Sequence, residues 1–223
     1  TGIVSVAQYE SLDHPTFPNN YDEVVSLTGK INAIVTVTDG DGDVATSTPA
    51  IGGQIRFGDD GPTAAIAATV ATVTHDESAN VQDDDTTAPP VAALFAGVTV
   101  KSTDMEGYAV SAAAVVSSAG SSTGEDEEGA TTLFSLSIAD ANSGLTTTDG
   151  SAITLTLESG LVVGRDTGGN AVFAISINST TGIVSVAQYE SLDHPTFPNN
   201  HDEVVSLTGK INAIVTVTDG DGD

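Results

Sequence analysis

One sequence occurs twice in the chain, and this repetition limits what the chain can fold into. Residues 1–43, which begin TGIVSVAQYE and end DGDGD, recur as residues 181–223, and the two copies differ only at Tyr21 and His201. The offset, 181 minus 1, is 180 residues, so the chain holds a little more than one period of a tandem array. Each unit of such an array contacts mainly its neighbours, and the array builds length. The repeat therefore favours an elongated structural protein over an enzyme.

The charge of the chain excludes two classes of partner. There are 31 acidic and 5 basic residues, and the net charge is −26. Nucleic acids and anionic membrane surfaces bind to positive patches, and the basic residues do not cluster. No apolar run reaches the roughly 20 residues of a membrane span, so we expect neither nucleic acid nor membrane insertion. Self-repulsion destabilises such a chain unless cations relieve it. The basic residues are Lys30, Arg56, Lys101, Arg165 and Lys210.

Short alternating runs predict an all-β fold. In residues 134–138 and 153–157 every second residue is apolar, as in antiparallel strands that bury one face. Gly, Asp and Asn clusters such as 149–150 and 168–170 are typical of the turns between strands. The pattern predicts an antiparallel β-sandwich with Greek-key connections. Further strands are expected at 31–37, 54–57, 64–73, 98–102, 161–164, 173–177, 183–189 and 211–217, with one helical turn at 91–96 and an Ala-rich stretch at 109–119 that fits either structure.

The sequence Asp-Asp-Gly-Pro at 59–62 predicts a module boundary, because Pro and Gly interrupt strand pairing and the paired acids are polar. Residues 1–58 are then the C-terminal part of one repeat. Residues 59–223 are the following repeat without its last strands, the counterpart of 44–58. The alternative register, with 1–180 as one permuted unit, remains open.

Three aspartates, Asp39, Asp41 and Asp43, alternate with glycines. In an extended chain such side chains share one face and lie roughly 6–7 Å apart, and glycine lets the segment curl and bring them closer. Ca²⁺ prefers oxygen ligands of this kind. An EF-hand would need Gly at the position of Val44 and Glu at that of Ala50, so that loop is excluded. The absence of cysteine excludes thiolate metal sites and disulfides, and calcium can stabilise a secreted protein instead.

Other acidic residues are weaker candidates for the same ion. The second copy of the DGDGD run supplies Asp219, Asp221 and Asp223, and the module boundary supplies Asp59 and Asp60. Asp76 and Glu77 form a further pair. The pairs and triples at 22–23, 83–85 and 104/106 fit solvated loops better than metal sites. The run 125–128, flanked by Ser and Gly, is expected to be a mobile solvated loop.

The closing sequence VTDGDGD, the strand ending IRFG at 55–58 and the sequence DDGPT at 59–63 resemble the long repeat of giant type I-secreted RTX adhesins. The segments YESLDHP at 189–195 and DES at 76–78 resemble that repeat too. The resemblance covers most of the chain but not 79–132. It implies Ig-like β-sandwich modules in tandem on the surface of a Gram-negative bacterium, with Ca²⁺ at the junctions between modules.

The resemblance also implies a role. In that family the modules are extenders between a membrane-proximal anchor and a ligand-binding tip that serves attachment and biofilm formation. Calcium ions and neighbouring repeats would be the partners, and we expect a secreted, extracellular chain that is monomeric. The implied junction ligands are Asp39, Asp41, Asp43, Asp59 and Asp60, with Asp219, Asp221 and Asp223 as copies of the first three.

The motifs that resemble those of enzymes are incomplete, and we expect that the chain is not an enzyme. Residues 120–124 match G-x-S-x-G, but a nucleophile elbow needs a strand before it and a helix after it, and here the flanks are Ser-rich and acidic. His14, His75 and His194 have no second His at zinc-ligand spacing. The alternative function is a glycan- or peptide-binding module, which the lack of Trp and the near-identity of the copies disfavour. A glycan array with and without Ca²⁺ would separate the two.

Overall fold

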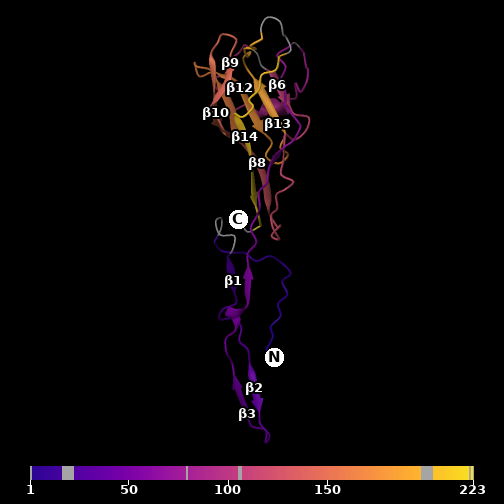
Figure 1. Cartoon of the computed structure of the whole chain (residues 1–223), viewed down its shortest axis with the longest axis vertical. Coiled ribbons are helices and arrows are strands. Elements are labelled where there is room, and N and C mark those ends of the chain that lie inside the picture. Colours follow the sequence, from indigo (N-terminus) through magenta and orange to yellow (C-terminus); the bar gives the residue numbers. More distant parts are fainter. Residues whose placement is uncertain are drawn as a thin grey trace. The chain divides into compact units, whose positions relative to one another are not determined.

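The computed structural model describes residues 2–16, 23–78, 80–104, 107–196, 203–220 and 222, and strands dominate them (Figure 1). The described pairings between named strands are antiparallel. The predicted all-β antiparallel fold is therefore confirmed, and the arrangement is consistent with a β-sandwich. No helix among the described residues is both long and apolar enough to cross a membrane.

The chain divides into two compact units. Unit 1 comprises Thr1–Thr63, Ser121–Thr131 and Val217–Asp223, and unit 2 comprises Ala64–Gly120 and Thr132–Thr216. The first crossing between them, after Thr63, lies close to the boundary that the sequence predicts at residue 59. Unit 1 is built from three separate segments of the chain, whereas the sequence predicts one boundary that divides the chain into two continuous parts.

Unit 2 contains a six-stranded sheet in the order β6-β13-β12-β11-β10-β9 (Figure 1). Tight turns at Asp149-Gly150 and Gly168–Asn170 join neighbouring strands, and Gly169 has φ of 86°. A residue with a side chain is strained at such a φ, which explains why glycine occupies the turn. The strands are β6 Gly107–Val110, β9 Asn142–Thr146, β10 Ala152–Glu158, β11 Leu161–Arg165, β12 Ala171–Ile177 and β13 Val184–Gln188.

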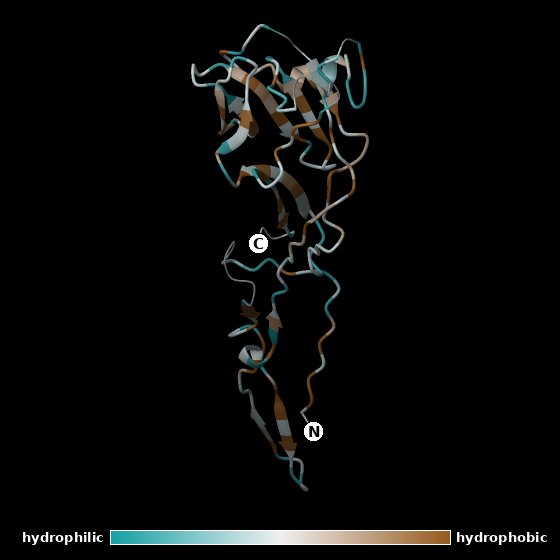
Figure 2. Ribbon diagram, turned by 45° about the horizontal axis from the view of Figure 1, so that its top comes forward, coloured by the Kyte–Doolittle hydropathy of each residue, from teal (hydrophilic) through white to brown (hydrophobic). Residues whose placement is uncertain are grey.

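Both faces of this sheet are covered. Successive residues of a strand point to opposite faces, and on β11 Val162 packs into one apolar cluster while Val163 packs into the other. Phe173 and Ile175 join the first cluster, and the second contains Phe95, which follows the short helix α1 (Pro89–Leu94). Figure 2 shows the hydrophobic residues along the strands of this sheet. Burial on both faces explains why β12 is buried almost throughout.

A second layer lies over the first cluster. β8 (Thr131–Ile138) pairs with β14 (Ile211–Thr218), and β5 (Ala67–Ala68) pairs with β7 (Val116–Ser117). Leu136 of β8 belongs to the cluster, and Ile211 of β14 packs against it. This layer is interrupted, because its pairs do not join into one sheet among the described residues.

Unit 1 is organised by a long irregular hairpin. β1 (Val24–Ser26) pairs with β4 (Arg56–Gly58), and β2 (Val35–Thr38) pairs with β3 (Val44–Ser47). Between these pairs, Ala33 N donates to Pro49 O over 3.0 Å. The 3-10 turn η1 (Gly52–Gln54) lies just before β4. The segment 24–38 thus runs antiparallel to 44–58 along its length.

Most predicted strands are confirmed, with three exceptions. The segment 31–37 is a strand only from Val35, and 64–73 is a strand only at Ala67–Ala68. The predicted strand at 98–102 is wrong: Val100 has φ of 52°, and only Lys101 forms a bridge, to Ala171. The helical turn at 91–96 is confirmed by α1, and the ambiguous stretch 109–119 contains the end of β6 and the two-residue β7.

Identical sequences differ in burial between the two copies. Tyr9 is 92% exposed, whereas its copy Tyr189 is 1% exposed. Val4 is 54% exposed and Val184 is 7% exposed. The second copy forms β13, which lies between β12 and β6, while the described part of the first copy has no strand before β1. The neighbouring strands, and not the local sequence, decide whether this segment is buried.

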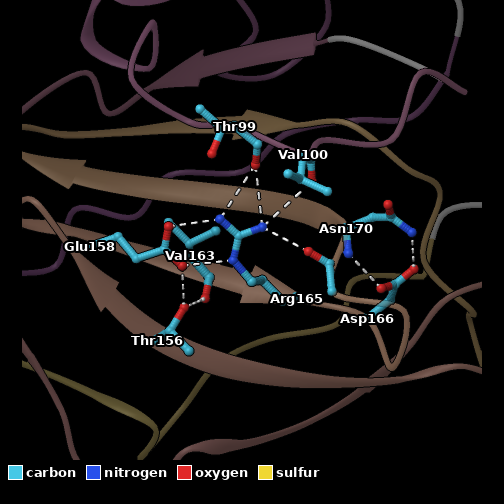
Figure 3. Close-up of polar contacts among 9 residues, drawn as sticks. Thr99, Val100, Thr156, Glu158, Val163, Arg165, Asp166 and Asn170 are labelled. Atoms are coloured by element: carbon cyan, nitrogen blue, oxygen red, sulfur yellow. Dashed lines mark hydrogen bonds and ion pairs between the residues drawn. The ribbon is translucent and has the colours of Figure 1, made fainter.

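Arg165 of β11 contacts both Glu158 of β10 and the segment 98–102 (Figure 3). Arg165 donates to both Glu158 oxygens over 2.7 Å, and it also donates to Thr99 O and Gly169 O. The Arg165 guanidinium, followed by the Thr156 hydroxyl, lowers the pKa of Glu158 from 4.5 to about 2. Contact with Glu158 raises the pKa of Arg165 in turn. The Arg165 side chain therefore adds to the two backbone hydrogen bonds between this segment and Ala171, from Ala171 N to Val100 O and from Ser102 N to Ala171 O.

Candidate metal centre

The run Asp39-Gly40-Asp41-Gly42-Asp43 forms the turn that joins β2 to β3. Asp39 N donates to Asp43 O over 3.0 Å and closes the turn. Asp39 Oδ1 accepts from Gly42 N at 3.1 Å and from Asp43 N at 2.9 Å. Gly42 has φ of 101°, a backbone conformation that favours glycine. The curl expected from the glycines is thus present.

The carboxylates of this turn lie close together. One ligand atom from each of Asp39, Asp41 and Asp43 lies within 4.8 Å of the others, and all three residues are exposed. Two oxygens bound to one Ca²⁺ at about 2.4 Å lie no more than about 4.8 Å apart. The three residues can therefore hold a metal ion, and their oxygens suit a hard cation. We name these three residues the turn site.

Asp39 is ionised at neutral pH. Contact with the Asp41 side chain, and then the Asp43 amide, lowers the pKa of Asp39 below its ordinary value of 3.8. The turn site is thus negatively charged under physiological conditions, as a cation site requires.

Asp59 lies in a different environment, next to a buried histidine. Its Oδ1 is 3.3 Å from His14 Nδ1, and the two side chains are 7% and 6% exposed. Asp59 Oδ1 also accepts from Asp60 N at 2.9 Å. Asp59 Oδ2 is buried and accepts no hydrogen bond from the described residues. A buried carboxylate oxygen of this kind is costly unless a partner such as a cation satisfies it.

Asp60 and Gly220, the residue after Asp219, both contact the same acidic loop. Asp60 Oδ2 accepts from Glu125 N at 3.1 Å, and Gly220 N donates to Asp126 O over 3.0 Å. Asp219 is 3% exposed, and its Oδ1 accepts from Gly222 N at 3.1 Å. The loop 124–128 thus gathers the start of the second repeat and its DGDGD run into one region. We name Asp59, Asp60, Asp126 and Asp219 the loop cluster; unlike the turn site, their carboxylates do not form a group of three potential metal ligands among the described residues.

The turn site and the boundary aspartates do not share an ion in this structure. Thr38 pairs with Val44 beside the turn site, whereas Val24 pairs with Gly58 next to Asp59. The two groups therefore lie at opposite ends of the same hairpin. It is the second DGDGD run, represented by Asp219, that shares the loop 124–128 with Asp60. Asp221 and Asp223, also expected to be ligands, lie outside the described residues.

Asp76 and Glu77 serve local structure in unit 2. Asp76 Oδ1 accepts from Ser78 N at 2.6 Å, and contacts with the Ser78 hydroxyl and amide lower the pKa of Asp76. Glu77 Oε1 accepts from the Gln188 side chain and from Leu192 N. Neither belongs to a group of three potential ligands among the described residues. The preceding His75 is buried, with Nδ1 2.6 Å from Asp85 Oδ1.

The loop 125–128, which the sequence predicts to be mobile and solvated, is mostly exposed, but it also makes contacts that the sequence does not reveal. Ser11 Oγ donates to Glu125 O over 3.2 Å, in addition to the contacts of the loop with Asp60 and Gly220. The loop borders a cavity of about 600 Å³ that four acidic side chains line. The density of acids was a visible signal, but their partners lie far away in the sequence. The four acids are Glu10, Asp13, Asp126 and Glu128.

These observations define an all-β antiparallel protein with clustered carboxylates suited to a hard cation. The chain belongs to the family described as Domain of unknown function (DUF5801), whose model matches residues 1–52 and 72–223. Among curated proteins there is no match to the chain. Among solved structures there is none either.

Proposed function

We propose that the chain is an extender of a bacterial cell-surface adhesin, built from Ig-like modules and rigidified by calcium. Its modules would hold a distant ligand-binding region clear of the cell for attachment or biofilm formation. The observation that carries the proposal is the repetition of 43 residues at an offset of 180 residues with one difference. Near-identical copies fit a role as a spacer, because every module can add length in the same way. They fit recognition of a ligand less well.

The excess of acids supports calcium as the ion. The net charge of −26 leaves most carboxylates without a basic partner, and seven of the 31 acidic residues belong to the turn site and the loop cluster. Calcium accepts exposed carboxylates, backbone carbonyls and water together. When bound, it would neutralise these groups and cross-link the chain segments that carry them.

The loop cluster is the proposed stiffening element. Asp59 and Asp60 open the second repeat, and Asp219 begins its DGDGD run. Because their carboxylates do not form a group of three potential ligands among the described residues, an ion would have to draw them together on binding, and it would then fix both ends of that repeat against the preceding one. Without the ion, the carboxylates repel and Gly58 and Gly61 leave the boundary flexible. Occupancy at extracellular calcium, about 10⁻⁴–10⁻³ M for extracellular modules, would let the chain leave the cell unfolded by type I secretion and fold outside.

Small-angle scattering tests this function on a stretch of the array that holds two or more complete modules. Ca²⁺ should lengthen the particle and narrow its distribution of shapes. The double change Asp59→Asn and Asp60→Asn should weaken that response while each module stays folded. Asp193→Asn, which removes an exposed charge far from both sites in the sequence, is the control. A particle equally bent and heterogeneous with and without Ca²⁺, its modules folded in both, would exclude the rod.

A further inference from the structure

The turn between β12 and β13 contains an acceptor sequence for N-linked sugars. Asn178, Ser179 and Thr180 match the pattern N-x-S/T with a middle residue other than proline. Every other asparagine of the chain lacks Ser or Thr two residues further on. Because a three-residue pattern also arises by chance, the turn itself has to offer what sugar transfer needs. It needs an accessible carboxamide nitrogen and an accessible hydroxyl two residues after it.

The turn presents these residues at the surface on a fixed backbone. All three residues of the acceptor sequence are exposed. Asn178 N donates to Ile183 O over 2.8 Å, and Gly182 N donates to Asn178 O over 2.9 Å. Ser179 O accepts from Phe134 N of β8 at 2.7 Å. A transferase can therefore reach the acceptor sequence in the folded protein, and an attached sugar would project from the turn without displacing buried side chains.

The same turn orients the carboxamide of Asn178. Its Oδ1 accepts from Thr180 N at 3.0 Å and from Thr181 N at 2.9 Å, which is the arrangement of an Asx-turn. Since both partners are donors, the atom that faces them is the oxygen, and Nδ2 lies on the other side of the carboxamide. Within the part of the chain that the structure describes, neither Nδ2 nor the Thr180 hydroxyl has a hydrogen-bond partner. Both groups are thus available to an enzyme.

Asn142 provides an internal comparison. It is also exposed and also followed by serine, and its Oδ1 accepts from Gly144 N at 3.1 Å. The two asparagines therefore share a turn geometry. They differ two residues further on, where Asn142 has a glycine and Asn178 has a threonine. Asn142 thus lacks the hydroxyl on which recognition of the acceptor sequence depends.

We propose that Asn178 is a modification site that carries an N-linked sugar. The donor is a sugar joined through its C1 atom to a diphosphate. Nδ2 of Asn178 forms a bond to C1, the bond from C1 to the diphosphate oxygen breaks, and the diphosphate leaves with the electron pair. Nδ2 loses one proton, and nothing is oxidised or reduced. The sugar adds a bulky, solubilising group to the surface of unit 2, and its attachment depends neither on calcium nor on the extender role.

Mass spectrometry of the protein, purified from the cells that naturally produce it, tests the proposal. Trypsin cleaves after Arg165 and Lys210, and no basic residue lies between them, so the peptide 166–210 contains the site. We expect this peptide to carry an added sugar mass that fragmentation places on Asn178. A nucleotide-linked donor adds sugars one at a time, whereas a lipid-linked donor adds a preassembled oligosaccharide, so the added mass identifies the donor. A peptide without added mass overturns the proposal.

Variants made in the same cells separate modification from folding. Asn178→Asp keeps an oxygen that accepts from the two amides of the turn but has no Nδ2, so it should fold and lose the sugar. Thr180→Ala should also lose the sugar, whereas Thr180→Ser should retain it. Asn142→Asp is the matched control and should leave the sugar mass unchanged. A sugar that persists on the peptide of Asn178→Asp, or that is unaffected by Thr180→Ala, would overturn the assignment to this acceptor sequence.

Discussion

Charged residues of this protein make two kinds of contact, one between opposite charges and one between like charges. Glu158 and Arg165 form a two-bond ion pair that holds a loop, whereas Asp39, Asp41 and Asp43 bring like charges together. The first contact stabilises by itself. The second is unfavourable until a cation compensates it. Two substitutions distinguish these situations.

The change Glu158→Gln should lower the stability of unit 2 by about 1 kcal/mol at pH 7. The pKa of Glu158 is depressed to about 2, but its side chain is 37% exposed, so solvent screening reduces the gain. A depressed carboxylate pKa contributes fully above the unfolded value of 4.5, and the contribution is lost as pH falls toward about 2.

Denaturant melts of the wild type and the variant between pH 7 and pH 2 measure this difference. The two stabilities should converge between pH 4.5 and about 2. Asp166→Asn removes a neighbouring carboxylate whose pKa is also lowered, but it leaves the Glu158–Arg165 pair in place, so this variant should still show the loss of the Glu158 contribution as pH falls. A stability difference that does not change with pH would contradict the assignment to the ion pair.

The change Asp41→Ala should lower the melting temperature in Ca²⁺ by roughly 2–5 °C, because weaker binding to the native state reduces stabilisation by mass action. In chelator the same change should have little effect. Thermal melts of the variant, with Asp193→Ala as the control, measure both. An equal loss in Ca²⁺ and in chelator would mean that Asp41 acts through the turn and not through an ion.

The turn site could be predicted from the sequence because its residues are neighbours in the chain. Alternate aspartates with glycines between them need only a local curl to converge. Of the loop cluster, Asp59, Asp60 and Asp219 are expected from the sequence, but Asp126 and the contact that it makes are not, since Gly220 N donates to Asp126 O across 94 residues, 220 minus 126. The hydrophobic periodicity of a sequence does not predict a contact between segments so far apart. A run of acidic residues in a Ser- and Gly-rich stretch is also more often solvated.

Elements show the same division between local and distant causes. Strands form at 134–138, 153–157 and 173–177, where the alternation of the sequence predicts them. The identical segments 31–37 and 211–217 do not behave alike: the first is a strand only from Val35, and the second is a strand throughout. Strand formation depends on pairing partners as well as on propensity.

The two copies supply a matched pair of substitutions. Tyr189→Ala should destabilise unit 2 by about 3–5 kcal/mol, as expected when a buried aromatic side chain is removed. Tyr9→Ala should change stability by less than about 0.5 kcal/mol. Tyr189 is 1% exposed and Tyr9 is 92% exposed, although the surrounding sequence is identical. Chemical denaturation of both variants measures the contrast, and equal effects would refute the difference in burial.

At the scale of the whole molecule, charge opposes folding. Thirty-one acidic residues face five basic ones, and the described ion pairs with Lys or Arg are Arg165–Glu158 and Lys210–Asp140. Most of the repulsion is therefore left to counterions. Monovalent salt screens it without selectivity, whereas a bound divalent ion acts at particular carboxylates.

Calorimetry should separate screening from binding. We expect the melting temperature to rise as Ca²⁺ is titrated in at moderate salt, with a midpoint near 10⁻⁴–10⁻³ M. Mg²⁺ at the same concentration is the control for ionic strength, since it demands a tighter octahedral site. If chelator leaves the melting temperature unchanged at low and at moderate salt, calcium is not a folding ligand.

The hairpin of unit 1 also has a mechanical consequence. Its two ends, Glu23 and Asp59, lie side by side, with Asp59 N bonded to Glu23 O over 2.9 Å. A pulling force applied to these two ends would load the hydrogen bonds between the paired segments one after another. The bonds would therefore break in sequence and not all together. Fully opened, residues 24–58 span roughly 120 Å. On the proposed role, each repeat would thus contain a reserve of length that yields first under flow, while the six-stranded sheet stays intact.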